Sequence, residues 1–318
     1  LKDNNSTYND AVIGKWHLGS DANHPNDMGV SHYAGLLGGG VSSYTNWSLT
    51  ENGQTTNSTE YTTSKFSDLA IDWLDTQAED KPWFLWLAYN APHTPFHLPP
   101  SDLHTQTSLS GDQTDIDANP LPYYIAAMEA MDTEIGRVLS SLSESELENT
   151  IIIFIGDNGT PNQVAQQYNS SRVKGSVYKG GINVPMVIAG KGVSRLNQQE
   201  DALINAPDLF ATIANIAGID VTEINDSKSF KPLLTNEAMD NRDYIYSGVD
   251  KNSGGEDYTI RNLTHKYILF DNGVEALYNL NDNPFENPNL LKANQLPLNA
   301  TNEAARDELV SKVQDIRN

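Results

Sequence analysis

The chain contains no cysteine, so it can form neither a disulfide nor a thiolate metal site, and a catalytic thiol is excluded. It also lacks any apolar run of about 18 residues, so we predict no membrane-spanning helix. Basic residues are scarce: 20 Lys and Arg stand against 42 Asp and Glu, a net charge of −22. Such a surface repels nucleic acids and anionic membranes, and we expect neither as a partner. An anionic substrate would need a locally positive site.

The chain has 318 residues, 38% of them hydrophobic, which is enough for a sizeable core. Four apolar runs, each followed by a polar turn, are typical of buried parallel strands: 11–13, 83–88, 151–155 and 184–189. Amphipathic helices are predicted at 63–77, with Ser64 as a cap, and at 123–142 and 206–217. This alternation predicts an α/β fold, a mostly parallel central sheet with helices on both faces.

The pattern changes near residues 236–242. Short alternating segments follow at 244–246, 258–261, 266–270 and 275–278, and Asp271-Asn272-Gly273 is a hairpin turn signal. We predict a small C-terminal antiparallel sheet and a closing helix over 303–316. The predicted domains are an α/β core over 1–238 and a small α+β subdomain over 239–318.

Polar residues that follow the predicted strands are the candidates for a site, because ligands of open α/β sheets bind outside the carboxyl ends of the strands. They are Lys15, His17, His93, Asp157 and Asn158. On an extended chain, Lys15 and His17 would point the same way and could hold an anion and move a proton. The alternative is a surface lysine beside a packed histidine. His93 lies between two prolines, in a stiff loop that suits catalytic positioning.

Asp157 and Asn158 offer a carboxylate and an amide oxygen, hard ligands suited to calcium or magnesium. The alternative is a plain Asp-Asn-Gly turn. Lys174, before a glycine, could add a second cation to the site or could be a solvated lysine. The Gly/Ser/Asn/Thr-rich stretch over 29–64, which contains Gly38-Gly39-Gly40, is predicted as a long surface loop, and its position after the first motif leaves a role near the site open.

The motif Gly14-Lys15-Trp16-His17-Leu18-Gly19 is similar to a sulfatase signature. Later motifs resemble that family in order, over nearly the whole chain: Ala91-Pro92-His93-Thr94-Pro95-Phe96, Asp157-Asn158-Gly159, Lys174-Gly175, Gly180-Gly181-Ile182-Asn183-Val184-Pro185, Lys266-Tyr267-Ile268, Glu275-Ala276-Leu277-Tyr278-Asn279-Leu280 and Asn283-Pro284-Phe285-Glu286-Asn287. The resemblance implies an arylsulfatase-like protein of the alkaline-phosphatase-like superfamily.

The resemblance also implies a function, a sulfuric ester hydrolase for small aryl or carbohydrate sulfates or sulfated polysaccharides. In that reading Asp157 and Asn158 bind Ca²⁺ (or Mg²⁺), and the groups around the sulfate are Lys15, His17, His93 and Lys174. The metal and the lysines would stabilise the charge on the leaving oxygen, which His93 would protonate, while His17 would help to regenerate the nucleophile.

The chain departs from the family pattern in its nucleophile. A formylglycine, made from Cys or Ser in a Cys/Ser-x-Pro/Ala-x-Arg context, is expected in the family, but the chain has no such site and lacks the paired Asp metal ligands. We therefore expect that the N-terminal part of the core is missing. Lys179 stands where an acid is usual and Asn183 where Arg is usual, which puts the substrate class in doubt.

Two alternatives to a sulfatase remain. One is a sulfatase-like fold with an incomplete site that binds anions or sugars or hydrolyses another ester, and the other is a phosphate or phosphonate monoesterase. If the chain is complete, its uncovered sheet edges predict a homodimer. The acidic, Asn-rich composition suggests a periplasmic or extracellular protein.

Overall fold

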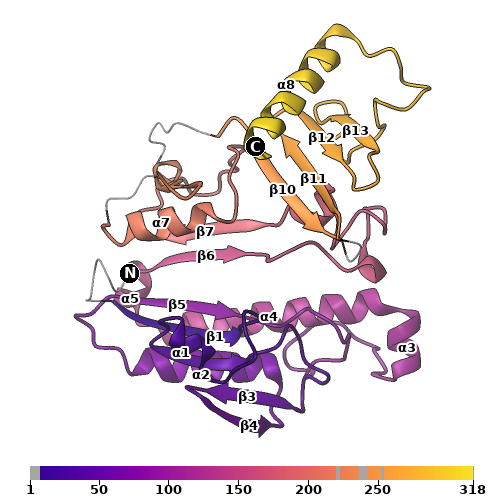
Figure 1. The fold of residues 1–318 in the computed structure, drawn as a ribbon. Helices are drawn as coiled ribbons and strands as arrows, with labels where there is room; N and C mark the ends of the chain where they lie inside the picture. Colours follow the sequence, from indigo (N-terminus) through magenta and orange to yellow (C-terminus); the bar gives the residue numbers. More distant parts are fainter. Residues whose placement is uncertain (1–7, 220–222, 236–241, 252–253, 318) are drawn as a thin grey trace. The chain divides into compact units, whose positions relative to one another are not determined.

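The computed structural model describes residues 8–219, 223–235, 242–251 and 254–317 (Figure 1). The chain divides into two compact units, residues 1–150 and residues 151–318. The predicted domain boundary at residues 238 and 239 lies outside the described residues and stays a prediction. In the described ranges, no helix combines the length and the apolar character needed to cross a bilayer.

The first unit is built on a five-stranded sheet in the order β4-β3-β2-β1-β5. Its strands are β1 (Asn9–Lys15), β2 (His32–Leu36), β3 (Trp47–Glu51), β4 (Gln54–Ser58) and β5 (Trp83–Ala88). β1 pairs in parallel with both β2 and β5, as predicted for the apolar runs at 11–13 and 83–88, whereas β3 and β4 extend the sheet antiparallel. The prediction of a long surface loop over 29–64 is therefore wrong, because this stretch supplies the three strands β2, β3 and β4.

Two long helices form the core of this unit with the sheet. They are α2 (Thr62–Asp75) and α4 (Pro120–Ser141), which contact each other. Phe66, Ala70 and Trp73 from α2 and Val138 from α4 meet the strand residues in one buried cluster. The residue that caps α2 is Tyr61, without a side-chain hydrogen bond, so the predicted Ser64 cap is wrong. Shorter helices are α1 (His24–Asp27), α3 (Gln113–Ala118) and α5 (Glu144–Glu148).

The second unit begins with a two-stranded sheet. β6 (Ile151–Ile155) pairs with β7 (Met186–Gly190) in the antiparallel direction. The apolar runs predicted strands here correctly, but the parallel direction expected for them is wrong in this pair, since an apolar run carries no information on strand direction. The unit also contains η1 (Asn162–Val164), α6 (Lys179–Ile182), α7 (Asp208–Ile216), β8 (Glu223–Ile224), β9 (Ser227–Lys228) and η2 (Lys231–Leu234).

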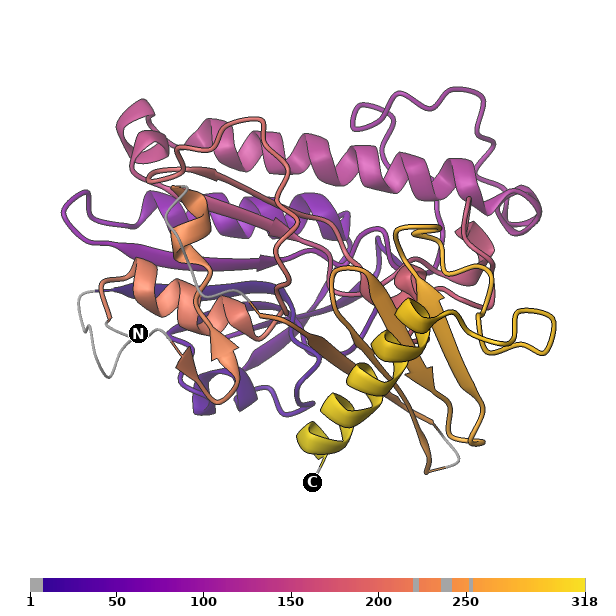
Figure 2. The same cartoon turned by 90° about the horizontal axis from the view of Figure 1, so that it is seen from above.

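The C-terminal part of this unit is a four-stranded antiparallel sheet with one helix lying across it (Figure 2). The elements are β10 (Ile245–Asp250), β11 (Glu256–Arg261), β12 (His265–Leu269), β13 (Glu275–Asn279) and α8 (Ala300–Arg317). The predicted hairpin turn is confirmed between β12 and β13, where the backbone N–H of Gly273 donates to Phe270 O at 2.9 Å. The predicted fold class, an α/β protein with a small C-terminal antiparallel sheet and helix, is confirmed.

Strand alternation gives this small sheet two different buried faces. Tyr267 and Leu277 pack with Leu309 and Val313 of α8. The opposite face, which carries Ile268, Ala276 and Tyr278, packs on Val177. The sheet therefore supports, from behind, the loop that carries Lys174.

Candidate functional site

The carboxyl ends of the parallel strands gather candidate residues in the first unit. Lys15 is the last residue of β1, His93 follows β5, and the Gly38-Gly39-Gly40 run follows β2. The strands approach closely here: a Cβ on Gly14, whose φ is +115°, would lie 2.1 Å from Ala88 O. A side chain at position 14 would therefore push β5 away from β1, so the glycine preserves the edge of the sheet.

Both candidate histidines lie against the glycine run. A Cβ at position 39 would lie 2.5 Å from Nε2 of His17, and a Cβ at position 40 would lie 3.2 Å from Nδ1 of His93. Two imidazole rings thus contact two consecutive residues of one loop. The structure brings His17 and His93 together, and the stretch over 29–64 does lie beside candidate site residues.

His17 does not have the extended backbone on which its predicted direction rested. Its φ is +56°, in the left-handed region, while its N–H donates to Leu37 O at 3.0 Å. The expectation that Lys15 and His17 point the same way because both are extended is therefore wrong at His17. The ring is exposed to solvent, whereas the intervening Trp16 packs edge-on against Tyr33 and donates its Nε1 hydrogen to His24.

His93 is held by its backbone and by one ring nitrogen. Nδ1 lies 2.8 Å from the carbonyl oxygen of Thr94, and a carbonyl oxygen only accepts, so Nδ1 carries the hydrogen. Nε2 makes no hydrogen bond to any described residue. The hydroxyl of Tyr44 donates to His93 O at 2.7 Å and to Asn90 O at 3.2 Å, which fixes the loop. The arrangement leaves Nε2 available to exchange a proton with a substrate.

Asp157 and Asn158 follow β6, as predicted, and both side chains are exposed. The Asp157 carboxylate accepts from the Asn158 backbone N–H at 2.9 Å and from its amide nitrogen at 2.6 Å. Oδ1 of Asn158 has no hydrogen-bond partner among the described residues. A carboxylate keeps further lone pairs when it accepts two hydrogen bonds, so both side chains retain acceptor capacity.

These two side chains fit calcium as part of a ligand set. Calcium takes about six to eight oxygen ligands, and one carboxylate with one amide oxygen supplies a minority of them. Within residues 8–317 and outside the undescribed gaps, no group of three or more His, Cys, Asp or Glu side chains could hold a metal. The predicted calcium ligands are one carboxylate and one amide, which do not make up such a group. Calcium binding therefore stays a prediction.

The loop that carries Lys174 is tied to the loop after β6. The backbone N–H of Lys174 donates to Thr160 O at 3.0 Å, and that of Gly159 donates to Gly181 O at 2.9 Å. A Cβ on Gly159 would lie 1.9 Å from Gly180 O, so only glycine permits this approach. The structure therefore brings Lys174, with an exposed side chain, to the loop of Asp157 and Asn158.

A buried ion pair that the sequence reasoning missed supports this loop. Lys266 Nζ lies 2.5 Å from Glu286 Oε1, and the side chain of each residue is 3% exposed. Nζ also donates to Val177 O at 2.7 Å, and the Glu286 carboxylate accepts from Lys179 N at 2.9 Å. Burial lowers the pKa of Lys266, although Glu286 opposes the shift. Both residues lie in motifs quoted for the resemblance, but nothing in the sequence indicated that they pair.

The six predicted residues thus fall into two sets, one in each unit: Lys15, His17 and His93, then Asp157, Asn158 and Lys174. That all six line one pocket stays a prediction.

Two family models match the chain. The model described as "Sulfatase" matches residues 4–219, and the model "N-sulphoglucosamine sulphohydrolase, C-terminal" matches residues 172–315. The second match begins at Arg172, before Lys174, and covers the ion pair and the C-terminal sheet.

Similar curated proteins are longer than this chain. The uncharacterized sulfatase YdeN of Escherichia coli is 28% identical over 245 residues, which cover 68% of this chain and 42% of that protein. An arylsulfatase of Klebsiella aerogenes is 23% identical over 319 residues, covering 71% of this chain and 68% of that protein. The chain thus spans less than half of the first relative and about two thirds of the second.

A similar solved structure is that of Ps i-CgsB in complex with k-i-k-neocarrahexaose. It superposes with a TM-score of 0.75 and is 25% identical, and the match covers 96% of this chain and 71% of the other.

Proposed function

The chain belongs to the sulfatase family, and from this premise we propose that the protein is a sulfuric ester hydrolase that acts on aryl or carbohydrate sulfate esters. One observation carries the proposal: two histidines and a lysine at the carboxyl edge of a parallel sheet, with both imidazoles against consecutive glycines. A core histidine would be enclosed, but the ring of His17 is exposed and His93 keeps Nε2 open.

We assign His93 the transfer of a proton to the leaving oxygen. Its Nδ1 hydrogen is held by Thr94 O, so His93 exchanges the proton through Nε2. His17 serves as the second proton-transfer group, which helps to regenerate the nucleophile. General acid–base steps of this kind contribute about 10² to 10⁴ in rate.

Lys15 and Lys174 hold the anionic ester. A sulfate monoester is negatively charged, and its leaving oxygen gains charge as the S–O bond breaks, so cations placed around it stabilise the transition state more than the ground state. The lysines also offset the negative field of a chain with a net charge of −22.

Asp157 and Asn158 would hold Ca²⁺, or Mg²⁺, through one carboxylate and one amide oxygen. When bound, the metal would supply positive charge next to the sulfate. We propose a formylglycine as the nucleophile of the active protein; this chain contains no cysteine to form one.

One family match and one similar solved structure favour a carbohydrate sulfate over an aryl sulfate as the substrate. The C-terminal part of the chain matches a family described as N-sulphoglucosamine sulphohydrolase, and one similar structure was solved with a neocarrahexaose. The choice of substrate, a homodimer and a periplasmic or extracellular location all stay predictions.

Release of inorganic sulfate tests the proposal. The intact protein, supplied with calcium, should hydrolyse 4-nitrophenyl sulfate, and chelation should abolish the activity. The control substrate is 4-nitrophenyl phosphate. Faster release of phosphate than of sulfate would favour the monoesterase alternative, and hydrolysis of neither aryl ester nor of a sulfated hexasaccharide would refute the proposed reaction.

A further inference from the structure

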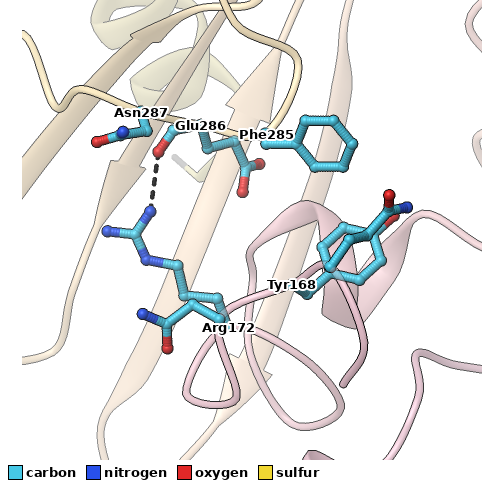
Figure 3. Close-up of a pocket in the computed structure, with 7 residues that line it drawn as sticks. Tyr168, Arg172, Phe285, Glu286 and Asn287 are labelled. Atoms are coloured by element: carbon cyan, nitrogen blue, oxygen red, sulfur yellow. Dashed lines mark hydrogen bonds between the residues drawn. The ribbon is translucent and has the colours of Figure 1, made fainter. Parts of the chain in front are cut away.

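A polar cavity of about 280 Å³ lies in the second unit, beside the loop that carries Lys174 (Figure 3). Two short segments line it. One contributes Gln167, Tyr168, Asn169 and Arg172, and the other contributes Phe285, Glu286 and Asn287. This volume lies just below the range of about 300–1,000 Å³ typical of small-molecule pockets, and it suits one sugar ring with its hydroxyl groups.

The two aromatic rings of the cavity come from different segments (Figure 3). Tyr168 and Phe285 lie with ring centroids 5.8 Å apart at 58°. The side chain of Phe285 is 45% exposed, although large apolar side chains are usually buried. An exposed ring beside a polar cavity offers a flat apolar surface for the C–H face of a sugar.

The polar groups of the cavity suit hydroxyl groups. Its rim carries the exposed amides of Gln167, Asn169 and Asn287, each with both a donor and an acceptor. The Asn169 oxygen already accepts from the N–H and the hydroxyl of Ser171, which leaves its NH₂ group as a donor. A ring face combined with several neutral donors and acceptors is complementary to a saccharide.

The charge around the cavity is positive. Arg172 donates to Glu286 O at 2.8 Å through one nitrogen, and its remaining N–H groups make no hydrogen bond to a described residue. The ammonium of Lys179 lies 5.4 Å from the centroid of the Phe285 ring, and Lys266 neutralises Glu286. The charged side chains that line the cavity are Arg172 and Glu286, and because Lys266 pairs with Glu286, the positive charge of Arg172 is left without a neutralising anion in the lining. Such a site favours an anionic saccharide over a neutral one.

We propose that this cavity is a saccharide subsite, which binds a sugar unit next to the one that carries the sulfate to be cleaved. The proposal rests on the proposed function, in which Lys174 contacts that sulfate. Arg172 and Lys174 are two residues apart on one loop, with Cα atoms at most about 7 Å apart, so the subsite and the proposed contact to the sulfate share that loop. Phe285 stacks on the sugar, and Arg172 binds a negative group on it.

The test separates binding at the subsite from catalysis. Binding of two sulfated hexasaccharides, one from carrageenan and one from heparin, is measured by titration calorimetry on the intact protein. Phe285→Ala should weaken the binding of the recognised hexasaccharide by a factor of about 2 to 12, the loss expected for one aromatic contact. The matched control is Leu263→Ala, since Leu263 is an exposed apolar residue of the same unit outside the cavity.

Kinetics give the second readout. Phe285→Ala should lower kcat/KM for the hexasaccharide and leave kcat/KM for 4-nitrophenyl sulfate, which has no second sugar, unchanged. Unaltered hexasaccharide binding in Phe285→Ala would overturn the subsite, and so would the absence of binding by both hexasaccharides. If the protein binds a hexasaccharide through Phe285 but cleaves neither sulfate, the proposed function fails and the subsite stands.

Discussion

The two units position their candidate residues by different physical means. In residues 1–150 the candidates sit at the end of a parallel sheet, where backbone hydrogen bonds and close glycine contacts set their places. In residues 151–318 the candidates sit in two loops that contact each other through Thr160 O and Lys174 N. The support for the loop of Lys174 comes from far along the chain, because Lys266, paired with Glu286, donates to Val177 O.

This difference determines where each of the two sets of candidate residues is vulnerable. A site at a sheet edge is disturbed by groups that enter the narrow space beside it, so small additions to neighbouring glycines matter most. A site on a loop is disturbed when its remote support is removed, so residues that touch no substrate matter there. The following substitutions test each set separately, in order of expected effect.

Replacing His93 should cause the largest loss. The variant His93→Ala removes the proposed proton donor, and we expect kcat to fall by about 10² to 10⁴. Turnover of 4-nitrophenyl sulfate by the intact enzyme is the measurement. The matched control is His32→Gln, because His32 begins β2 and so lies at the amino end of the same parallel sheet. Wild-type turnover in His93→Ala would remove this residue from the mechanism.

Breaking the buried ion pair should destabilise the second unit strongly. The variant Lys266→Met leaves the buried Glu286 carboxylate without its cation, which costs about 3–5 kcal/mol in comparable pairs. Urea unfolding followed by fluorescence gives the free energy of unfolding. The control is Arg306→Met, which breaks a pair with Glu275 in which both side chains are 36% exposed and which should cost at most about 1 kcal/mol.

The double variant Lys266→Met/Glu286→Leu sharpens that result. Because both charges are removed, it should be more stable than Lys266→Met, even though Lys179 N loses its acceptor. Equal or lower stability of the double variant would show that the Glu286 carboxylate contributes mainly by accepting the hydrogen bond from the backbone N–H of Lys179, rather than by pairing with Lys266.

The sequence predicted the positions of His93 and Asp157 well, because each follows an apolar run and strand ends can be read from such runs. It did not predict β4, whose residues are Gln, Thr, Asn and Ser and are mostly exposed. Strand propensity reflects half-buried packing, and a polar outer strand lacks that signal.

The sequence also could not predict the antiparallel direction of β6 and β7, or the pairing of Lys266 with Glu286. Both depend on where the chain returns in space, and an apolar run or a single charged residue has no local signal for that. The left-handed backbone of His17 is a similar case, since non-glycine residues rarely adopt it and the sequence carries no signal for it at this position.

Adding one methyl group beside His17 should reduce activity while the fold survives. In Gly39→Ala, the new Cβ would lie 2.5 Å from His17 Nε2, so the exposed ring must move. A displacement near 1 Å can cost about 10² in rate. Gly38→Ala is the matched control, because its nearest atom would be 3.8 Å away. Equal kcat in the two variants would show that His17 needs no fixed position.

The smallest effect concerns pH and the support of His93. His97 stacks on Tyr44 with centroids 3.8 Å apart, and the Tyr44 hydroxyl holds the His93 loop. Nδ1 of His97 donates to Pro95 O, so its Nε2 accepts from the Tyr61 hydroxyl at 3.0 Å. Burial lowers the pKa of His97 below its usual value of 6.5.

Protonation of His97 is therefore more costly in the folded state than in the unfolded state. Above pH 6.5 the ring is neutral in both states; below it the unfolded state binds the proton first, so the free energy of unfolding falls until the pH passes the lowered pKa. In His97→Gln this fall in the free energy of unfolding should vanish. The measurement is urea unfolding at several pH values between about pH 7 and pH 5, a range that includes the usual histidine pKa. His32, whose pKa is also lowered by burial, keeps its own contribution in both proteins, so the difference between them isolates His97. Identical pH slopes in the two proteins would mean that the folded state accommodates a charged His97 ring as readily as the unfolded state does.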